Sequence, residues 1–328
     1  MKRTLLPILL LLLLTACGQG QEEPAMVQKT NFQMDTVVTV TLYDWTDETA
    51  IDQAFREIDR LEALLSVEKE DSDLDRLAKA AGQDWVEIAP ETREVLELAK
   101  ESYTISDQML DVTAGPLIDL WDINNGGHYP SQAELDAVLP LIGSDRLLVE
   151  DGRAFLSDPG MKANLGAVAK GYIADRVKDL LTGLGVEHAV LDLGRNILLI
   201  GGKAEDTPFR IGIQDPNGEA GELLAVLEVS DKSLVTSGVY ERYFEYEGKR
   251  YHHILDPKTG FPVENGLAAV TILSDASAQG DALSTTCLLL GRERGMALIE
   301  SLPGVEALFV DSDGTQTATS GFDAYRVQ

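Results

Sequence analysis

The spacing of apolar residues along the chain predicts a mixture of helices and strands. Apolar residues recur every three or four positions in residues 51–65 and 166–184, as in a helix with one buried face. β-Branched runs such as residues 37–43 are typical of strands. Further helices are expected at 71–80, from Pro90, from the capping box at 131–134, at 278–290 and at 293–301, and further strands at 189–193, 197–200, 209–213, 223–229, 251–255, 268–273 and 305–310.

These elements mix without strict alternation, and neither a repeat nor a linker follows residue 30. The predicted fold class is therefore α+β (mixed α/β), a single large domain over residues 31–328 with a mixed or antiparallel sheet core flanked by helices. The 328 residues are 44% hydrophobic, which is enough for a sizeable core despite a net charge of −28. So acidic a chain should be repelled by nucleic acid and by anionic membrane surfaces.

The N-terminus has the pattern of an export signal. Lys2 and Arg3 precede an apolar stretch, residues 5–14, that is too short to span a membrane. Residues 14–17 (Leu-Thr-Ala-Cys) look like a bacterial lipobox, whose cysteine is lipidated; the alternative is an ordinary secretory signal with an incidental cysteine. We predict a signal peptide at 1–16, a tether at 17–30 after lipidated Cys17, and a lipid-anchored location on the extracytoplasmic face of the cell membrane. The other cysteine, Cys287, lies in an apolar run and is expected to be a buried thiol.

Two adjacent histidines precede an Asp-Pro-Lys-Thr-Gly turn at residues 256–260. On an extended strand, neighbouring side chains point to opposite faces, so His253 should point away from Ile254 and His252. An imidazole at a strand end suits a general base or acid. A pair of ordinary polar-strand histidines is the alternative that the residues alone leave open.

Three other stretches carry candidate chemistry. Asp281 and Thr285 lie four residues apart at an expected helix start, so that both oxygens could hold Mg2+; simple charge complementarity at the helix N-terminus is the alternative. A glycine-bearing turn precedes Lys170, which could meet a phosphate, although a glycine at a helix start is common. Gly194 interrupts two strands, either for close approach of a ligand or for a hairpin turn.

In this order, the stretches resemble the FAD:protein FMN transferase (ApbE) family of bacterial flavin transferases, over about residues 31–310. The most specific match is residues 253–260, preceded by Thr-Ser-Gly at 236–238. Further matches are residues 34–36, residues 111–117 with Trp121, and the stretches around Lys170 and Gly194. The resemblance implies an ApbE-like fold.

The resemblance also implies a reaction. FMN passes from FAD to a threonine or serine hydroxyl of a target protein with Mg2+, forming a phosphoester, and AMP leaves. Mg2+ would be held by Asp281, Thr285, the Ala167 carbonyl and the Ser284 hydroxyl, and His253 would be the base. Positions matching contacts to the flavin, adenine or phosphates are Met34, Met109, Leu110, Asp111, Asn164, Lys170, Ser237 and Gly238. The expected partners are FAD and acceptor proteins with a Thr/Ser motif, by resemblance membrane redox subunits.

The chain departs from the family pattern at three positions. Glu68 stands where an aromatic residue is usual, Ala78 stands in place of an asparagine, and Arg195 stands in place of the second of two glycines. The arginine could reach a phosphate or narrow the site. Two alternative functions use the same residues: a Mg2+-dependent FAD pyrophosphatase that gives FMN and AMP, and a lipid-anchored protein that binds FAD without turnover.

Overall fold

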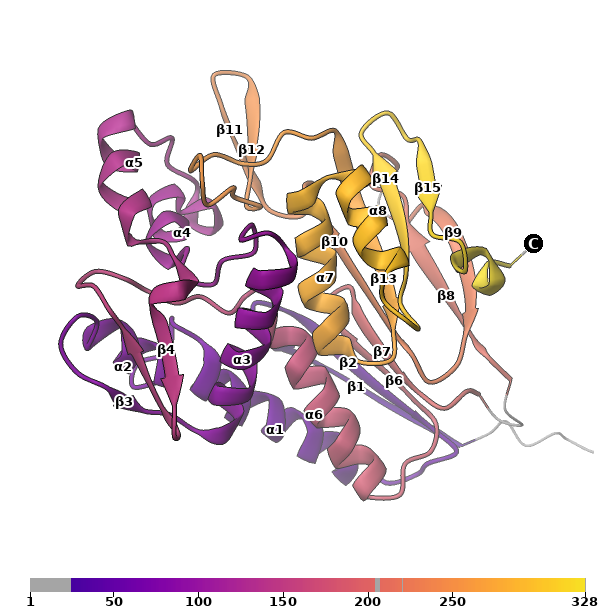
Figure 1. Cartoon of the computed structure of the whole chain (residues 1–328). Coiled ribbons are helices and arrows are strands. Elements are labelled where there is room, and N and C mark those ends of the chain that lie inside the picture. The colour runs from indigo at the N-terminus through magenta and orange to yellow at the C-terminus, as the bar shows by residue number, and fades with distance from the viewer. Residues whose placement is uncertain (1–24, 204–206, 220, 328) are drawn as a thin grey trace, which may run out of the picture.

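The computed structural model describes residues 25–203, 207–219 and 221–327, and its core is one antiparallel sheet of eight strands (Figure 1). Every neighbouring pair in this sheet runs antiparallel, which confirms the predicted α+β domain. In spatial order the strands are β1 (Met26–Gln33), β2 (Thr36–Tyr43), β6 (Ala189–Leu193), β7 (Asn196–Ile200), β10 (Ser233–Gly238), β13 (Leu267–Ser274), β14 (Glu306–Asp311) and β15 (Gln316–Ala318).

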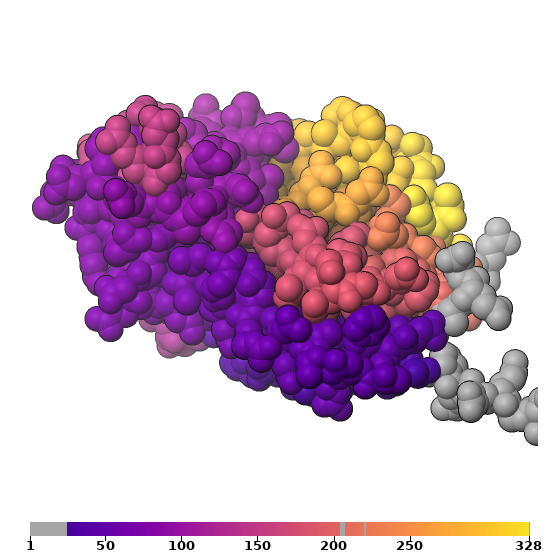
Figure 2. Space-filling view, turned by 90° about the horizontal axis from the view of Figure 1, so that it is seen from below, coloured from indigo at the N-terminus to yellow at the C-terminus, as the bar shows by residue number. Residues whose placement is uncertain are grey.

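Helices cover one face of this sheet. Helix α1 (Thr49–Leu65) packs on α6 (Ala169–Gly183), α6 packs on α7 (Ser277–Leu290), and α7 packs on α8 (Arg292–Glu300). Each of these helices turns buried side chains toward the sheet, including Ile58, Val177 and Leu283. Figure 2 shows the indigo N-terminal part of the chain directly against the salmon middle part, as the contacts of α1 with α6 require.

The opposite face of the sheet is covered by a hairpin and the C-terminal turn. The hairpin consists of β8 (Phe209–Gln214) and β9 (Leu223–Val229), and the turn is the 3-10 helix η5 (Phe322–Tyr325). Phe209 and Phe322 are almost fully buried there against Leu199 and Leu308 of the sheet. Both faces of the central strands are therefore buried, which explains why β13 is apolar nearly throughout.

The remaining elements form the side of the molecule that bears α4 and α5 (Figure 1). A small sheet has the order β3-β5-β4, and a hairpin of β11 and β12 packs around the buried indole of Trp121. The bounds of these elements are α2 (Asp73–Lys79), β3 (Val86–Glu87), α3 (Pro90–Ile105), α4 (Gly115–Trp121), η1 (Ile123–Asn125), α5 (Gln132–Val138), η2 (Leu139–Leu141), η3 (Ser144–Arg146), β4 (Leu147–Glu150), β5 (Arg153–Leu156), β11 (Tyr243–Tyr246) and β12 (Lys249–His252). The predicted capping box at the start of α5 is confirmed.

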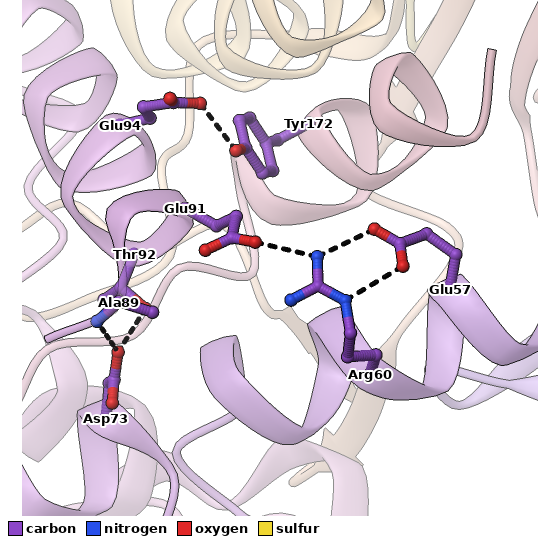
Figure 3. A network of polar contacts seen from close by, with 8 residues as sticks. All are labelled: Glu57, Arg60, Asp73, Ala89, Glu91, Thr92, Glu94 and Tyr172. Carbon is purple, nitrogen blue, oxygen red and sulfur yellow. Dashed lines mark hydrogen bonds and ion pairs between the residues drawn. The ribbon is translucent and has the colours of Figure 1, made fainter. Parts of the chain in front are cut away.

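Polar contacts join the helices of this side to those on the sheet (Figure 3). The Arg60 guanidinium of α1 donates to Glu91 of α3 at 2.8 Å. The Tyr172 hydroxyl of α6 donates to Glu94 of α3 at 2.6 Å. Asp73 of α2 accepts the backbone N–H of residue 89, just before α3, at 2.7 Å. The contact of Tyr172 with Glu94 holds α3 against the N-terminal end of α6, where the candidate site begins, and the other two contacts hold α3 against α1 and α2.

Several predicted boundaries need correction. The predicted tether overlaps β1, because this edge strand starts at Met26 and its polar exposed residues gave no apolar run to recognise. The strand predicted at 251–255 ends at His252, and α7 starts at Ser277, so Asp281 lies in its second turn. The predicted signal peptide and Cys17 lie outside the described residues. Among the helices that the structure describes, none has both the length and the apolar content to cross a membrane.

Candidate active site

A cleft of about 880 Å³ lies where the helix layer, the sheet and the α4 side meet. Its walls come from the β1–β2 turn, the end of α1, the loop before α4, the start of α6, strand β10 and helix α7. This volume is toward the upper end of the range for small-molecule sites, roughly 300–1,000 Å³. Most of the predicted site residues line it: Met34, Met109, Leu110, Asp111, Asn164, Ala167, Lys170, Ser237, His253, Asp281 and Thr285.

Asp281 is a buried carboxylate, 4% exposed, at the floor of this cleft. Its Oδ2 accepts the backbone N–H of Gly171 at 2.9 Å, and its Oδ1 accepts no hydrogen bond from any residue that the structure describes. Burial raises the pKa of Asp281, while the Lys170 charge and the Gly171 N–H oppose that rise. An anionic oxygen held in this way at the cleft floor suits a hard cation.

The first turn of α7 is served by a different carboxylate. Asp175 of α6 accepts the backbone N–H groups of Ser277 and Ala278, both at 2.8 Å. Asp281 is one turn further along α7, where the N-terminal N–H groups are out of reach. Charge complementarity at the helix start therefore does not account for Asp281.

The Ala167 carbonyl is available because Gly171 does not bond to it. In a regular helix the N–H of residue 171 would donate to the carbonyl of residue 167, but here it donates to Asp281 instead. A Cβ at Gly171 would lie 2.2 Å from the Ser277 carbonyl oxygen, so the close crossing of α6 and α7 requires glycine. The crossing brings the Ala167 carbonyl and the Asp281 carboxylate to the same cleft.

Two predicted site residues do not line the cleft. Ser284 is fully buried outside the cleft lining: its hydroxyl donates to the Asp281 backbone carbonyl at 2.9 Å, and its oxygen lies 2.8 Å from the Ser237 hydroxyl, which is then the donor to it. Gly238 lies under Tyr240, whose ring would be 2.3 Å from a Cβ at position 238. The glycine is required for this close packing of the chain rather than for contact with phosphate.

His253 lines the cleft, and the neighbouring His252 does not; the strand predicted through both residues ends at His252, and Ile254 lines the cleft together with His253. The Nδ1 atom of His253 is 3.2 Å from the Arg242 carbonyl oxygen, which can only accept, so Nδ1 carries the proton and Nε2 keeps a lone pair. Burial lowers the pKa of His253 to about 4. The imidazole is therefore neutral near pH 7 and ready to accept a proton.

The cleft lining is strongly acidic. It includes two cationic side chains, Lys170 and Arg242, against eight carboxylates: Asp35, Glu62, Glu68, Asp111, Asp119, Asp122, Glu241 and Asp281. The Lys170 ammonium makes no ion pair or hydrogen bond with the residues that the structure describes, so it is available to an anion. A polyanionic ligand would be repelled by this lining unless a cation accompanied it.

Side chains at the mouth differ in what they can offer a ligand. Both carboxylate oxygens of Asp111 are used within the protein, since they accept from Thr113 and Ser144 at 2.6 to 3.0 Å. Its role is to shape the loop that presents Met109 and Leu110. Glu68 also lines the cleft, so a carboxylate lies at the position where the sequence resemblance led us to expect an aromatic residue.

Several residues of the cleft were given no site role in the sequence analysis. Glu241 contributes a carboxylate whose Oε1 is buried without a hydrogen-bond partner. Trp121 and Tyr243 contribute the aromatic rings of the lining. Glu241 and Tyr243 belong to the same stretch as the Thr-Ser-Gly motif at 236–238, but no spacing in that stretch showed that their side chains reach the cleft.

The fold and the cleft define a class: an α+β protein that brings a buried carboxylate, a neutral histidine and an unpaired lysine to one deep acidic site. Residues 34–309 match the sequence model of the ApbE family, and the chain belongs to this family. A relative from Klebsiella pneumoniae (strain 342), named FAD:protein FMN transferase, is 37% identical over 280 residues, which are 84% of this chain and 86% of that protein. One of the same name from Treponema pallidum (strain Nichols) is 35% identical over 295 residues, 85% of this chain and 82% of that protein.

Solved structures agree with this assignment. The flavin transferase ApbE from Vibrio cholerae superposes with a TM-score of 0.83 at 27% identity, covering 92% of this chain and 100% of that one. The ApbE protein from Thermotoga maritima superposes with a TM-score of 0.85 at 27% identity, covering 93% of this chain and 100% of that one. The resemblance inferred from the sequence motifs is thereby confirmed.

Proposed function

We propose that the protein is a Mg2+-dependent FAD:protein FMN transferase, which moves FMN from FAD to a Thr or Ser hydroxyl of an acceptor protein and releases AMP. The family membership and the names of its relatives support the activity. The observation that carries the chemistry is that one cleft combines the free Asp281 oxygen with a neutral His253. A protein that only bound FAD would need no proton acceptor there.

The residues at the cleft floor fit Mg2+. Asp281 Oδ1, the Ala167 carbonyl and the Thr285 hydroxyl are all hard oxygen donors, which is the ligand type that Mg2+ prefers. When bound, Mg2+ would neutralise charge on the diphosphate and favour departure of AMP. The surplus of carboxylates in the lining supports an absolute requirement for the metal, because FAD bears a negative diphosphate.

The protein's own groups supply the remaining steps. His253 Nε2 would take the proton from the acceptor hydroxyl as that oxygen attacks the FMN phosphorus, while the Arg242 carbonyl stabilises the resulting imidazolium through Nδ1. Lys170 would pair with a phosphate oxygen. Met109 and Leu110 offer apolar contacts for the rings of FAD.

Location and partners form a second part of the proposal. The lipobox at residues 14–17 supports lipidation of Cys17 after removal of residues 1–16, which would hold the domain at the extracytoplasmic face of the cell membrane. Acceptors would then be proteins with a Thr/Ser motif exposed on the same side, such as membrane redox subunits. Labelling with radioactive palmitate in a bacterial host tests the anchor, with Cys17→Ser as the control that should remain unlabelled.

The decisive experiment is incubation with FAD, Mg2+ and an acceptor peptide of the form Asp-x-x-Thr-Gly-Ala-Thr, followed by mass spectrometry. A peptide heavier by FMN, with release of AMP, is expected. AMP with free FMN and an unmodified peptide would indicate a pyrophosphatase instead, and unchanged FAD would indicate a binding protein. The matched control is a peptide with Ala in place of the acceptor Thr.

A further inference from the structure

Arg195 has an unusual backbone conformation in the turn between β6 and β7. Its φ angle is +69°, directly after Gly194 with φ +67°. A left-handed conformation is uncommon for a residue with a side chain and costs about 1 kcal/mol or more. The turn is nevertheless well held, because Asp192 accepts the Gly194 N–H at 3.0 Å and the Arg195 carbonyl accepts the Thr236 N–H at 3.1 Å.

In this conformation the Arg195 side chain lies against Tyr240 and Glu241. Its guanidinium donates to the Tyr240 hydroxyl and lies over the Tyr240 ring, 4.8 Å from the centroid. Its Nε is 3.8 Å from Glu241 Oε1. Arg195 is not part of the cleft lining, so these contacts engage the guanidinium with the protein rather than with a phosphate.

The segment that Arg195 contacts is the one that orients His253. Residues 238–241 form a turn in which the Glu241 N–H donates to the Gly238 carbonyl at 3.4 Å. Arg242 directly follows this turn, and its carbonyl oxygen accepts both the His253 backbone N–H at 3.1 Å and the His253 ring Nδ1–H at 3.2 Å. Arg195 thus holds residues 240 and 241, and the adjoining residue 242 holds the imidazole.

We propose that Arg195 is a positioning residue for the reaction: through Tyr240 and Glu241 it fixes the Arg242 carbonyl, which sets the orientation and tautomer of His253. The inference rests on the proposed function, in which His253 Nε2 accepts the proton. Because the acceptor hydroxyl must meet Nε2 at hydrogen-bond distance, a small displacement of the ring lowers the rate without weakening FAD binding.

The first test is Arg195→Gly, which is suited to this position because glycine adopts a positive φ without strain. The variant should fold, with a melting temperature equal to or above that of the wild type. We expect kcat for FMN transfer to fall roughly ten- to a hundred-fold, with KM for FAD and the Mg2+ concentration for half-activation within two-fold of wild type. A purely structural role would lower the melting temperature and leave kcat per folded molecule unchanged.

The second test is Tyr240→Phe, which removes the hydroxyl that the guanidinium contacts and keeps the ring. This single variant should also lower kcat. The double variant should lose little more of its kcat than Arg195→Gly does, because both changes remove the same contact between Arg195 and Tyr240. Losses that multiply, or a wild-type kcat in Arg195→Gly, would overturn the inference. A wild-type enzyme that transfers no FMN would instead refute the proposed function, so the two failures are distinguishable.

Discussion

Replacing Asp281 with Asn should stabilise the metal-free protein while removing its response to Mg2+. Asn has nearly the same shape, and its amide oxygen can still accept the Gly171 N–H that Oδ2 accepts at 2.9 Å. What disappears is a negative charge that is 4% exposed and has Lys170 as its nearby cation. The charge is useful only when a cation binds, so in the metal-free state it should lower the free energy of unfolding.

The expected magnitude follows from this burial. Desolvation of a buried carboxylate costs several kcal/mol, and the N–H of Gly171 and the charge of Lys170 offset part of it, leaving about 1–3 kcal/mol for Asn to recover. For a domain of this size the corresponding rise in melting temperature is about 2–6 °C. Since the pKa of Asp281 is raised above 3.8, the wild type carries the full penalty only above that raised pKa. The advantage of Asn should therefore vanish at low pH and grow as the pH rises.

Thermal unfolding with and without Mg2+ measures both effects. At a hundred-fold excess over its dissociation constant, Mg2+ should stabilise the wild type by about 2.7 kcal/mol and leave Asp281→Asn unchanged. The matched control is Asp175→Asn, which changes a half-buried carboxylate that caps α7 by accepting two N–H bonds of 2.8 Å. It should lose about 1 kcal/mol and keep its Mg2+ response. A metal-free Asp281→Asn that melts below the wild type, or one that Mg2+ still stabilises, would refute the reasoning.

Three further predictions address the rest of the site. His253→Ala should abolish FMN transfer, while FAD binding measured by equilibrium dialysis should stay within a few-fold of wild type. Because burial lowers the pKa of His253 to about 4, kcat/KM of the wild type should decline on the acid side near that pH, and a decline near pH 6.5 would argue against this base. Thr285→Ala should raise the Mg2+ concentration for half-activation about ten-fold. Ser284→Ala should leave that concentration unchanged, because the Ser284 hydroxyl donates to the Asp281 backbone carbonyl outside the cleft lining; equal effects of the two variants would contradict the ligand assignment. Gly171→Ala should destabilise the folded protein by about 1–3 kcal/mol and weaken Mg2+ activation, because its Cβ would lie 2.2 Å from the Ser277 carbonyl oxygen. A Mg2+ titration of this variant that matches the wild type would refute the role of the α6–α7 crossing.

Periodicity was sufficient to predict the elements with a buried face. Helices α1 and α6 and strand β2 appear close to their predicted bounds, because one row of buried side chains produces a regular spacing in the sequence. Strand β1 was missed for the converse reason: it is an edge strand with mostly exposed residues, and its pairing with β2 leaves no such row.

The sequence by itself also determined which residues could carry the chemistry. The motifs around Asp281 and His253 identified the family, since the order of short motifs along the chain does not depend on knowing their contacts. Between the two adjacent histidines, the family resemblance rather than local side-chain alternation singled out His253, because the strand on which that alternation was argued ends at His252.

Only the tertiary structure decided what each residue does. Asp175 and Asp281 are both carboxylates near the start of α7, yet one caps the helix and the other is left free for a cation. The two carboxylates differ because α6 and α7 cross at Gly171, and this crossing brings together residues about a hundred positions apart in the sequence. Likewise Arg195, which in the sequence could have reached a phosphate, is engaged by Tyr240. Which polar groups are paired and which remain free depends on long-range packing, and no local spacing encodes it.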